Sequence, residues 1–274
     1  MTSQSVQSRR LTESGMGELL SLPPTVTPEG IGKQVREAAV NSGCVLVRER
    51  SLDQDEFLRL VAAVGDKVEY KLGEGRADLL MLNASRDKDK VVTGRGPLPL
   101  HTDGVLVGTR TDLIILYAVD FKDTPGSGET YVVDQMAAWK EMPESLRSVI
   151  EERDFEYRVE EPDFYPTAPA GWYAVPNFRD YGGGHRALNL STGYQADSEP
   201  RSWSVRVPGM TAEESRSFLA ELDGFLRSPR YTYQHRWQSG DLLLINNQRT
   251  MHGRTPISPD GIRLLWRGQV AEVA

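Results

Sequence analysis

The chain has 274 residues, of which 39% are hydrophobic and 26% charged, and its formal net charge is −7. This composition is typical of a globular protein and excludes a mostly disordered chain. The acidic balance and the lack of a Lys/Arg-rich run argue against binding to nucleic acid. Because all-β domains of this size are common, we expect residues 1–274 to form a single domain.

The only cysteine and the start of the chain bear on the compartment. Cys44 lies in an apolar run and is expected in the core, and one thiol excludes an intrachain disulfide or a cysteine-rich metal site. No stretch reaches the roughly 18 apolar residues of a membrane span, so no membrane partner is expected. The polar start lacks the apolar region of a signal peptide, which predicts a cytoplasmic protein.

Four helices are predicted from caps and apolar periodicity. Thr27-Pro28 suits the start of the first helix, and Gly43 suits its end. Residues 53–64 predict the second helix and residues 143–151 a short one. The sequence Thr211-x-x-Glu214 is a capping box that precedes the fourth.

Strands dominate the rest of the chain, and the continuous apolar run 113–119 is expected to be buried on both faces. The other strands are predicted at 44–48, 231–237, 241–245 and 263–270. The Pro-, Gly- and Tyr-rich stretch within residues 155–205 is typical of a long, lid-like insertion. This pattern favours an α+β fold with a jelly-roll (double-stranded β-helix) core and flanking helices.

Three residues form a candidate metal site. His101 and Asp103 are two positions apart, so on extended backbone their side chains point to the same side. His252 follows a late strand, whose end a jelly roll brings beside an early one. Two histidines and one carboxylate are the facial triad of non-haem Fe(II) oxygenases, and they leave coordination positions open. Of the other histidines, His235 is expected inside the barrel and His185 at the surface or in the lid.

Two arginines on one face of the last predicted strand extend this site. Arg263 and Arg267 share a face with Leu265, whereas Leu264 and Trp266 share the other. If the strand lines a barrel, Arg263 reaches inward near the metal and clamps a carboxylate, and Arg267 holds a second anion. We therefore expect Arg267 to face the cavity without a protein carboxylate as its partner, and a substrate that carries a carboxylate or similar oxyanion to pair with it.

The combination resembles the Fe(II)/2-oxoglutarate-dependent oxygenases of the taurine dioxygenase and clavaminate synthase type, and within them the carbapenem synthase branch. It comprises His101-Thr102-Asp103, Thr130, His252, Arg263 and Arg267, with Val91-Val92-Thr93-Gly94-Arg95-Gly96, Glu141-Met142-Pro143, Ser228-Pro229-Arg230-Tyr231 and Trp266-Arg267-Gly268-Gln269. The stretch from Thr167 to Ser202 departs from the β-lactam enzyme.

The resemblance implies a role for each matching residue. His101, Asp103 and His252 would be the catalytic iron ligands, and Thr130 with Arg263 would bind the distal carboxylate of 2-oxoglutarate. The substrate would meet Arg267 and three aromatic residues, which are Tyr70, Tyr165 and Trp203. The implied reaction uses dioxygen to oxidise a C–H bond of a small molecule in antibiotic or other secondary metabolism, by hydroxylation, desaturation, cyclisation or epimerisation.

Three alternatives stay open. The substrate could instead be a small sulfonate, amino acid or carboxylate. A cupin-like metal-binding isomerase would use the same barrel without 2-oxoglutarate, and an interaction protein would keep only a degenerate site. The sequence is compatible with a homo-oligomer.

Overall fold

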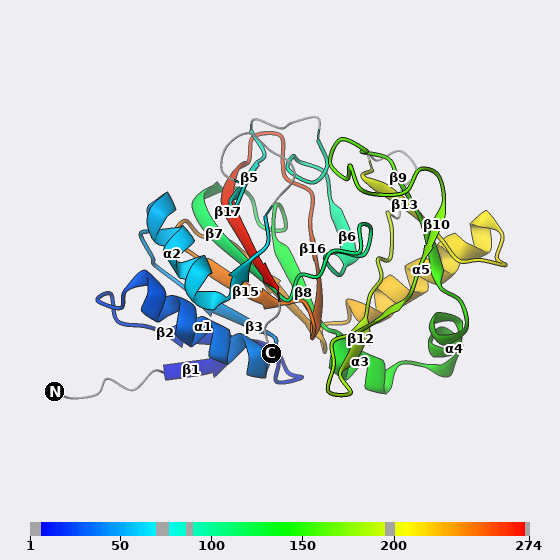
Figure 1. Cartoon of the computed structure of the whole chain (residues 1–274), viewed down its shortest axis with the longest axis horizontal. Coiled ribbons are helices and arrows are strands. Elements are labelled where there is room, and N and C mark those ends of the chain that lie inside the picture. The colour runs from blue at the N-terminus through cyan, green and yellow to red at the C-terminus, as the bar shows by residue number, and fades with distance from the viewer. Residues whose placement is uncertain (1–6, 70–76, 86–89, 195–200, 272–274) are drawn as a thin grey trace.

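The computed structural model describes residues 7–69, 77–85, 90–194 and 201–271, and Figure 1 shows its arrangement of helices and sheets. Its helices are α1 (Pro28–Ser42), α2 (Gln54–Val64), α3 (Gln135–Glu141), α4 (Glu144–Glu152) and α5 (Ala212–Leu226). The mixed helix and sheet structure expected from the sequence is confirmed. No helix in the described part is long and apolar enough to cross a membrane.

The predicted helices begin where their caps indicate. Thr27 and Asp53 accept hydrogen bonds from backbone N–H groups in the first turns of α1 and α2. Thr211 and Glu214 form the expected capping box of α5. α3 is a helix that the sequence analysis missed, and its N-cap Asp134 directly follows a strand.

The larger sheet has the order β1-β2-β3-β15-β7-β17-β4, and β5 also pairs with β17. Its strands are β1 (Gln7–Arg10), β2 (Glu18–Ser21), β3 (Cys44–Val47), β4 (Asp66–Lys67), β5 (Leu80–Asn83), β7 (Leu113–Lys122), β15 (Leu242–Asn246) and β17 (Ile262–Ala271). Leu113 to Ala118 are buried, as predicted, whereas Val119 at the end of the predicted run is half-buried. Helices α1 and α2 cover one face of this sheet, as Figure 1 shows.

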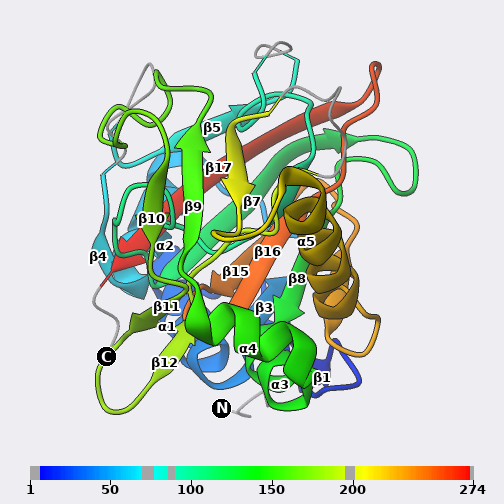
Figure 2. The same ribbon diagram turned by 90° about the vertical axis from the view of Figure 1, so that its right-hand side faces the viewer.

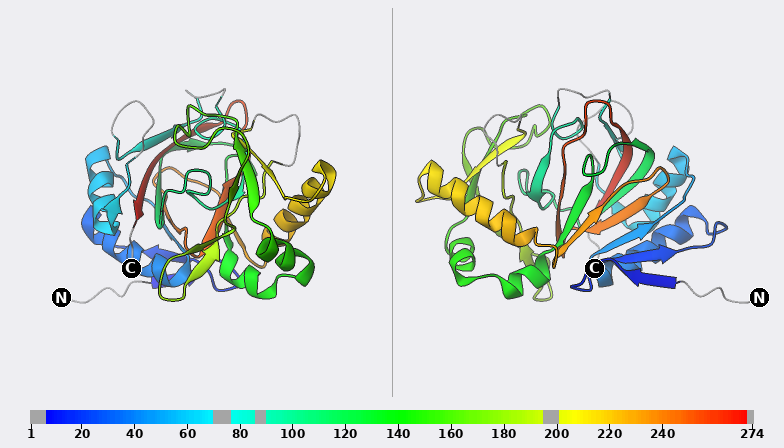
Figure 3. Two further views of the ribbon diagram at one scale, coloured as in Figure 1. Left: turned by 45° about the vertical axis from the view of Figure 1, so that its right-hand side comes forward. Right: turned by 180° about the vertical axis from the view of Figure 1, so that it is seen from behind.

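The smaller sheet has the order β14-β8-β16-β6, and its outer face packs against α3, α4 and α5 (Figure 2). Its strands are β6 (Leu98–His101), β8 (Thr130–Asp134), β14 (Thr232–His235) and β16 (Thr250–Arg254). Alternation along β8 places Tyr131 and Val133 in the outer core and Val132 in the core between the sheets. The two views in Figure 3 show the two sheets facing each other.

Cys44 and His235 are buried between the sheets, which confirms their predicted positions. Burial raises the pKa of the Cys44 thiol to about 12, so this thiol is neutral at neutral pH. The stretch from 155 to 205 forms β9 (Phe155–Val159), β10 (Tyr173–Val175), β11 (Phe178–Asp180), β12 (Arg186–Leu188) and β13 (Trp203–Arg206). β10, β9 and β13 form a separate sheet.

Candidate metal centre

The two histidines of the candidate triad come from neighbouring antiparallel strands. His101 ends β6, and His252 is the middle residue of β16 directly opposite it. Their ring centroids are 4.4 Å apart. Asp103 lies in the turn that follows β6. Strand pairing therefore brings together two residues that are 151 positions apart in the chain. β16 itself was not predicted, because it is short and follows the polar turn after β15 directly.

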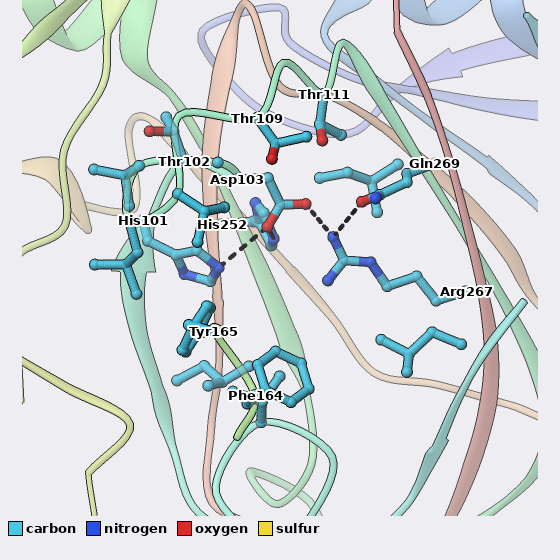
Figure 4. A pocket seen from close by; sticks show the side chains of 18 of the residues that line it. His101, Thr102, Asp103, Thr109, Thr111, Phe164, Tyr165, His252, Arg267 and Gln269 are labelled. Carbon is cyan, nitrogen blue, oxygen red and sulfur yellow. Dashed lines mark hydrogen bonds and ion pairs between the residues drawn. The ribbon is translucent and has the colours of Figure 1, made fainter. Parts of the chain in front are cut away.

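One donor atom from each of the three side chains lies within 4.8 Å of the others. Asp103 Oδ1 is 3.6 Å from His101 Nε2 and 3.9 Å from His252 Nε2. His101 Nδ1 lies 2.8 Å from the carbonyl oxygen of Pro99, which can only accept a hydrogen bond. Nδ1 is therefore the ring nitrogen that carries the proton of a neutral His101, and Nε2 is the one that faces Asp103, as Figure 4 shows.

The surroundings of the site favour the protonation states that metal ligands need. Burial by itself would raise the pKa of Asp103, but the neighbouring charge of Arg267 outweighs it and holds that pKa well below its usual range. Burial, together with the neighbouring His101, lowers the pKa of His252 to about 3. An ionised carboxylate and a neutral imidazole are the forms that bind divalent metals.

The depressed pKa of His252 predicts that the metal-free protein loses stability as the pH falls below about 6.5. Between about 3 and 6.5 the unfolded chain binds a proton at this position that the folded chain excludes, so acid favours unfolding. At pH 5 the loss is about 2 kcal/mol from this residue. Urea titrations at pH 7 and pH 5 would measure it.

His252→Gln is expected to reduce this pH dependence, because glutamine does not titrate. His185→Gln is the matched control, since His185 is half-buried and hydrogen-bonds the carbonyl of Gln248 away from the triad. An unchanged pH dependence in the His252 variant would contradict the assignment.

Arg263 and Thr130 both line the cavity that contains the triad. The Arg263 guanidinium is 3% exposed, and its Nε donates to the carbonyl of Gly128. Burial, with the nearby charge of Arg254, moves the Arg263 pKa well below its usual range. Among the described residues no carboxylate forms an ion pair with Arg263. Thr130 Oγ1 accepts a hydrogen bond from Trp237 Nε1, which directs its hydroxyl hydrogen elsewhere. A buried cation beside a hydroxyl donor suits a carboxylate.

The structure corrects the expectation for Arg267. Its side chain does face the pocket, as predicted from the alternation along β17. However, its guanidinium donates to Asp103 Oδ2, and Gln269 Oε1 lies 3.4 Å from the same nitrogen. The prediction that Arg267 lacks a protein carboxylate is wrong, because the turn after β6 places Asp103 opposite β17. The argument for an acidic substrate from a lone guanidinium therefore fails.

Two of the three aromatic residues predicted to contact the substrate belong to the described part of the chain. Tyr165 and Trp203 line the pocket, and the Trp203 ring centroid lies 5.6 Å from that of His101. Trp203 Nε1 donates to Ser191 Oγ, which fixes the indole. Tyr70 lies outside the described residues, so its position is not assigned. The cavity has a volume of about 380 Å³, and in Figure 4 Tyr165 lies on one side of the triad, whereas Thr109 and Thr111 lie on the other.

Two buried residues next to the triad were not predicted from the sequence. Arg254, two positions after His252, donates to the carbonyls of Val91, Val92 and Gly96 and so holds one wall of the pocket. Asn247 hydrogen-bonds the backbone of Asp103. The only sequence feature that pointed to Asn247 was its place in the polar turn before β16. For Arg254 the feature was its position two residues after His252, which puts both side chains on the same face of β16.

Comparison with known proteins agrees with this geometry. Residues 11–269 match the family model of taurine catabolism dioxygenase TauD, TfdA family. The chain is similar to a 3-((Z)-2-isocyanoethenyl)-1H-indole synthase of Fischerella ambigua, with 21% identity over 79% of this chain and 77% of the relative. It is also similar to a tyrosine isonitrile desaturase of Erwinia amylovora, with 23% identity over 87% of this chain and 83% of the relative.

Solved structures show the same fold. PvcB from Pseudomonas aeruginosa superimposes with a TM-score of 0.70 and 22% identity, over 98% of this chain and 93% of that one. A putative α-ketoglutarate-dependent taurine dioxygenase from Burkholderia xenovorans superimposes with a TM-score of 0.68 and 19% identity, over 98% of this chain and 91% of that one. The narrower resemblance to the carbapenem synthase branch stays a prediction.

Proposed function

Because the chain belongs to the TauD/TfdA family, whose members are Fe(II)- and 2-oxoglutarate-dependent dioxygenases, we propose that it oxidises a C–H bond of a small natural-product intermediate. The observation that carries this proposal is the convergence of His101, Asp103 and His252 in one cavity with the buried Arg263. Family membership favours this enzyme over the cupin-like isomerase and the interaction protein.

Each residue has a role in the proposed reaction. His101 Nε2, Asp103 Oδ1 and a ring nitrogen of His252 would hold Fe(II), and these donors fit it because two imidazoles and a carboxylate converge at one point. Arg263 and Thr130 would bind the distal carboxylate of 2-oxoglutarate. When bound, iron with 2-oxoglutarate and dioxygen supplies an oxidant strong enough to remove hydrogen from an unactivated C–H bond.

The cavity also supports a proposal for the substrate. Tyr165 and Trp203 provide an aromatic surface near His101, so we expect an apolar or aromatic group to lie there. Two relatives, matched over 77% and 83% of their length, have names that refer to isonitrile chemistry, one on an indole and one on tyrosine. We therefore propose an aromatic, isonitrile-bearing intermediate, with desaturation as the first outcome to test among hydroxylation, desaturation, cyclisation and epimerisation.

We also propose a role for each part of the fold. The two facing sheets would be the halves of a jelly roll, residues 155–205 would form a lid over the site, and residues 1–274 would act as one oxygenase domain. Phe164, Tyr165 and Trp203 support the lid, since all three come from this stretch and line the cavity.

A small carboxylate is the second candidate substrate. It is favoured by similarity to an α-ketoglutarate-dependent 2,4-dichlorophenoxyacetate dioxygenase of Cupriavidus pinatubonensis, with 27% identity over 62% of this chain and 58% of the relative.

The test measures succinate formation by the purified chain with Fe(II), 2-oxoglutarate and dioxygen. We expect tyrosine isonitrile to raise the rate at least about tenfold over the rate without substrate, because a bound substrate couples 2-oxoglutarate consumption to its own oxidation. Stimulation by 2,4-dichlorophenoxyacetate, and not by tyrosine isonitrile, would favour the second candidate. No succinate with any substrate, together with no binding of 2-oxoglutarate, would contradict the oxygenase.

A further inference from the structure

Asn247 is a buried asparagine in the turn between β15 and β16, and all of its polar side-chain atoms are engaged. Its Oδ1 accepts a hydrogen bond of 2.9 Å from the backbone N–H of Asp103. Its Nδ2 donates to the carbonyls of Asp103, at 3.2 Å, and Thr111, at 2.8 Å. Its own backbone N–H donates to the carbonyl of Asp112 at 2.8 Å. One residue thus holds both ends of the segment 103–112.

This contact matters because Asp103 lies beyond the end of a strand. The sheet pairing of β6 stops at His101, and Thr102 N–H bonds the carbonyl of Leu190. Within the described part of the chain, both backbone hydrogen bonds of Asp103 go to Asn247. The position of the Asp103 main chain relative to the two histidines therefore depends on this side chain.

Asn247 also lies five residues before His252 in the same β-turn and strand unit. A shift of this turn would consequently move Asp103 relative to His252. The Asp103 side chain is held separately, since its Oδ2 accepts from Arg267 and its Oδ1 faces the two imidazoles. Loss of a contact that orients a metal ligand commonly lowers the metal affinity by about 10–100-fold.

We propose that Asn247 is a positioning residue of the metal centre, which holds the main chain of Asp103 so that its carboxylate meets His101 and His252. This inference rests on the proposed metal centre. Asn247 itself does not contact the metal, the cosubstrate or the substrate.

The neighbouring Asn246 provides a matched control. It is also buried and lies in the same connection, but it faces away from the site. Its Nδ2 donates to the carbonyl of Ala39 in α1, and its Oδ1 accepts from the N–H of Gln248. Removing the Asn247 side chain takes away the donor to the carbonyls of Asp103 and Thr111, and removing that of Asn246 takes away the acceptor of the Gln248 N–H. Both variants are therefore expected to lose stability. Only one of them releases Asp103.

The experiment titrates Mn(II) into the full-length, metal-free chain by calorimetry, with thermal unfolding measured in parallel. For Asn247→Ala we expect the dissociation constant to rise at least about tenfold, and for Asn246→Ala less than about threefold. Equal changes in both variants, or no change in Asn247→Ala, would overturn the proposal. Failure of the unmodified chain to bind Mn(II) would overturn the metal centre and this role together.

Asn247→Asp tests the same role if the alanine variant does not fold. The aspartate keeps the size of the side chain and the acceptor for Asp103 N–H, but it places an anionic oxygen against the carbonyls of Asp103 and Thr111. Its added negative charge would by itself strengthen cation binding. A weaker affinity for Mn(II) therefore indicates a displaced turn, and an unchanged or stronger affinity contradicts the proposal.

Discussion

Asp103→Ala is expected to lower the rate of succinate formation at least about a hundredfold. Loss of a metal ligand should reduce activity more than loss of a residue that only orients the ligand. Asp103 is the only anionic member of the candidate triad, and its Oδ1 lies between the two imidazoles. Coupled assays of succinate would measure the loss, and circular dichroism would show that the fold is kept. Turnover equal to that of the unmodified enzyme would contradict the assignment.

Because Asp103 pairs with Arg267, the Asp103→Ala variant is also expected to lose stability, and a second substitution at Arg267 provides the control. Asp103→Ala leaves the largely buried Arg267 guanidinium without this partner, which costs up to about 3–5 kcal/mol. The double variant Asp103→Ala/Arg267→Met removes both charges and is expected to recover much of that stability. Its turnover should stay absent. Recovery of stability without recovery of activity would separate loss of a ligand from loss of folding.

Arg263→Leu is expected to weaken 2-oxoglutarate binding at least about a hundredfold, or about 2.7 kcal/mol. The guanidinium is buried beside Thr130, and among the described residues no carboxylate pairs with it. The distal carboxylate would lose this partner in a site poor in water. Calorimetric titration of the metal-loaded enzyme measures the affinity, and a change of less than about threefold would mean that another cation binds 2-oxoglutarate.

The stability of the same variant provides a second, independent check. Burial of the Arg263 cation is unfavourable in the absence of an anion, as the lowered pKa indicates. Without 2-oxoglutarate, Arg263→Leu is therefore expected to be at least as stable as the unmodified chain, yet 2-oxoglutarate should no longer raise its melting temperature. Arg263→Lys keeps a charge without the bidentate geometry. The rise in its melting temperature with 2-oxoglutarate should therefore lie between that of the unmodified chain and that of the Leu variant. A Leu variant that 2-oxoglutarate still stabilises would count against the anion site.

Local features of the sequence determined the helices and the direction of side chains along strands. Thr27, Asp53 and Thr211 cap the helices at their predicted starts. Alternation along the last strand correctly placed Arg263 and Arg267 toward the cavity. These predictions hold because capping and the two-residue period of a strand depend only on neighbours in the chain.

Contacts between distant segments were decided by the tertiary structure alone. The register of β16 against β6 sets His252 opposite His101, and the facing of β17 against the turn after β6 pairs Arg267 with Asp103. Asn247 reaches Asp103 across 144 positions of the chain. Sequence spacing carries no information on strand register or on which turn meets which strand, since these follow from packing the two sheets together. For that reason the candidate ligands could be named from the sequence by their residue types and spacing, whereas the contacts of Asn247 and Arg267 with Asp103 could not.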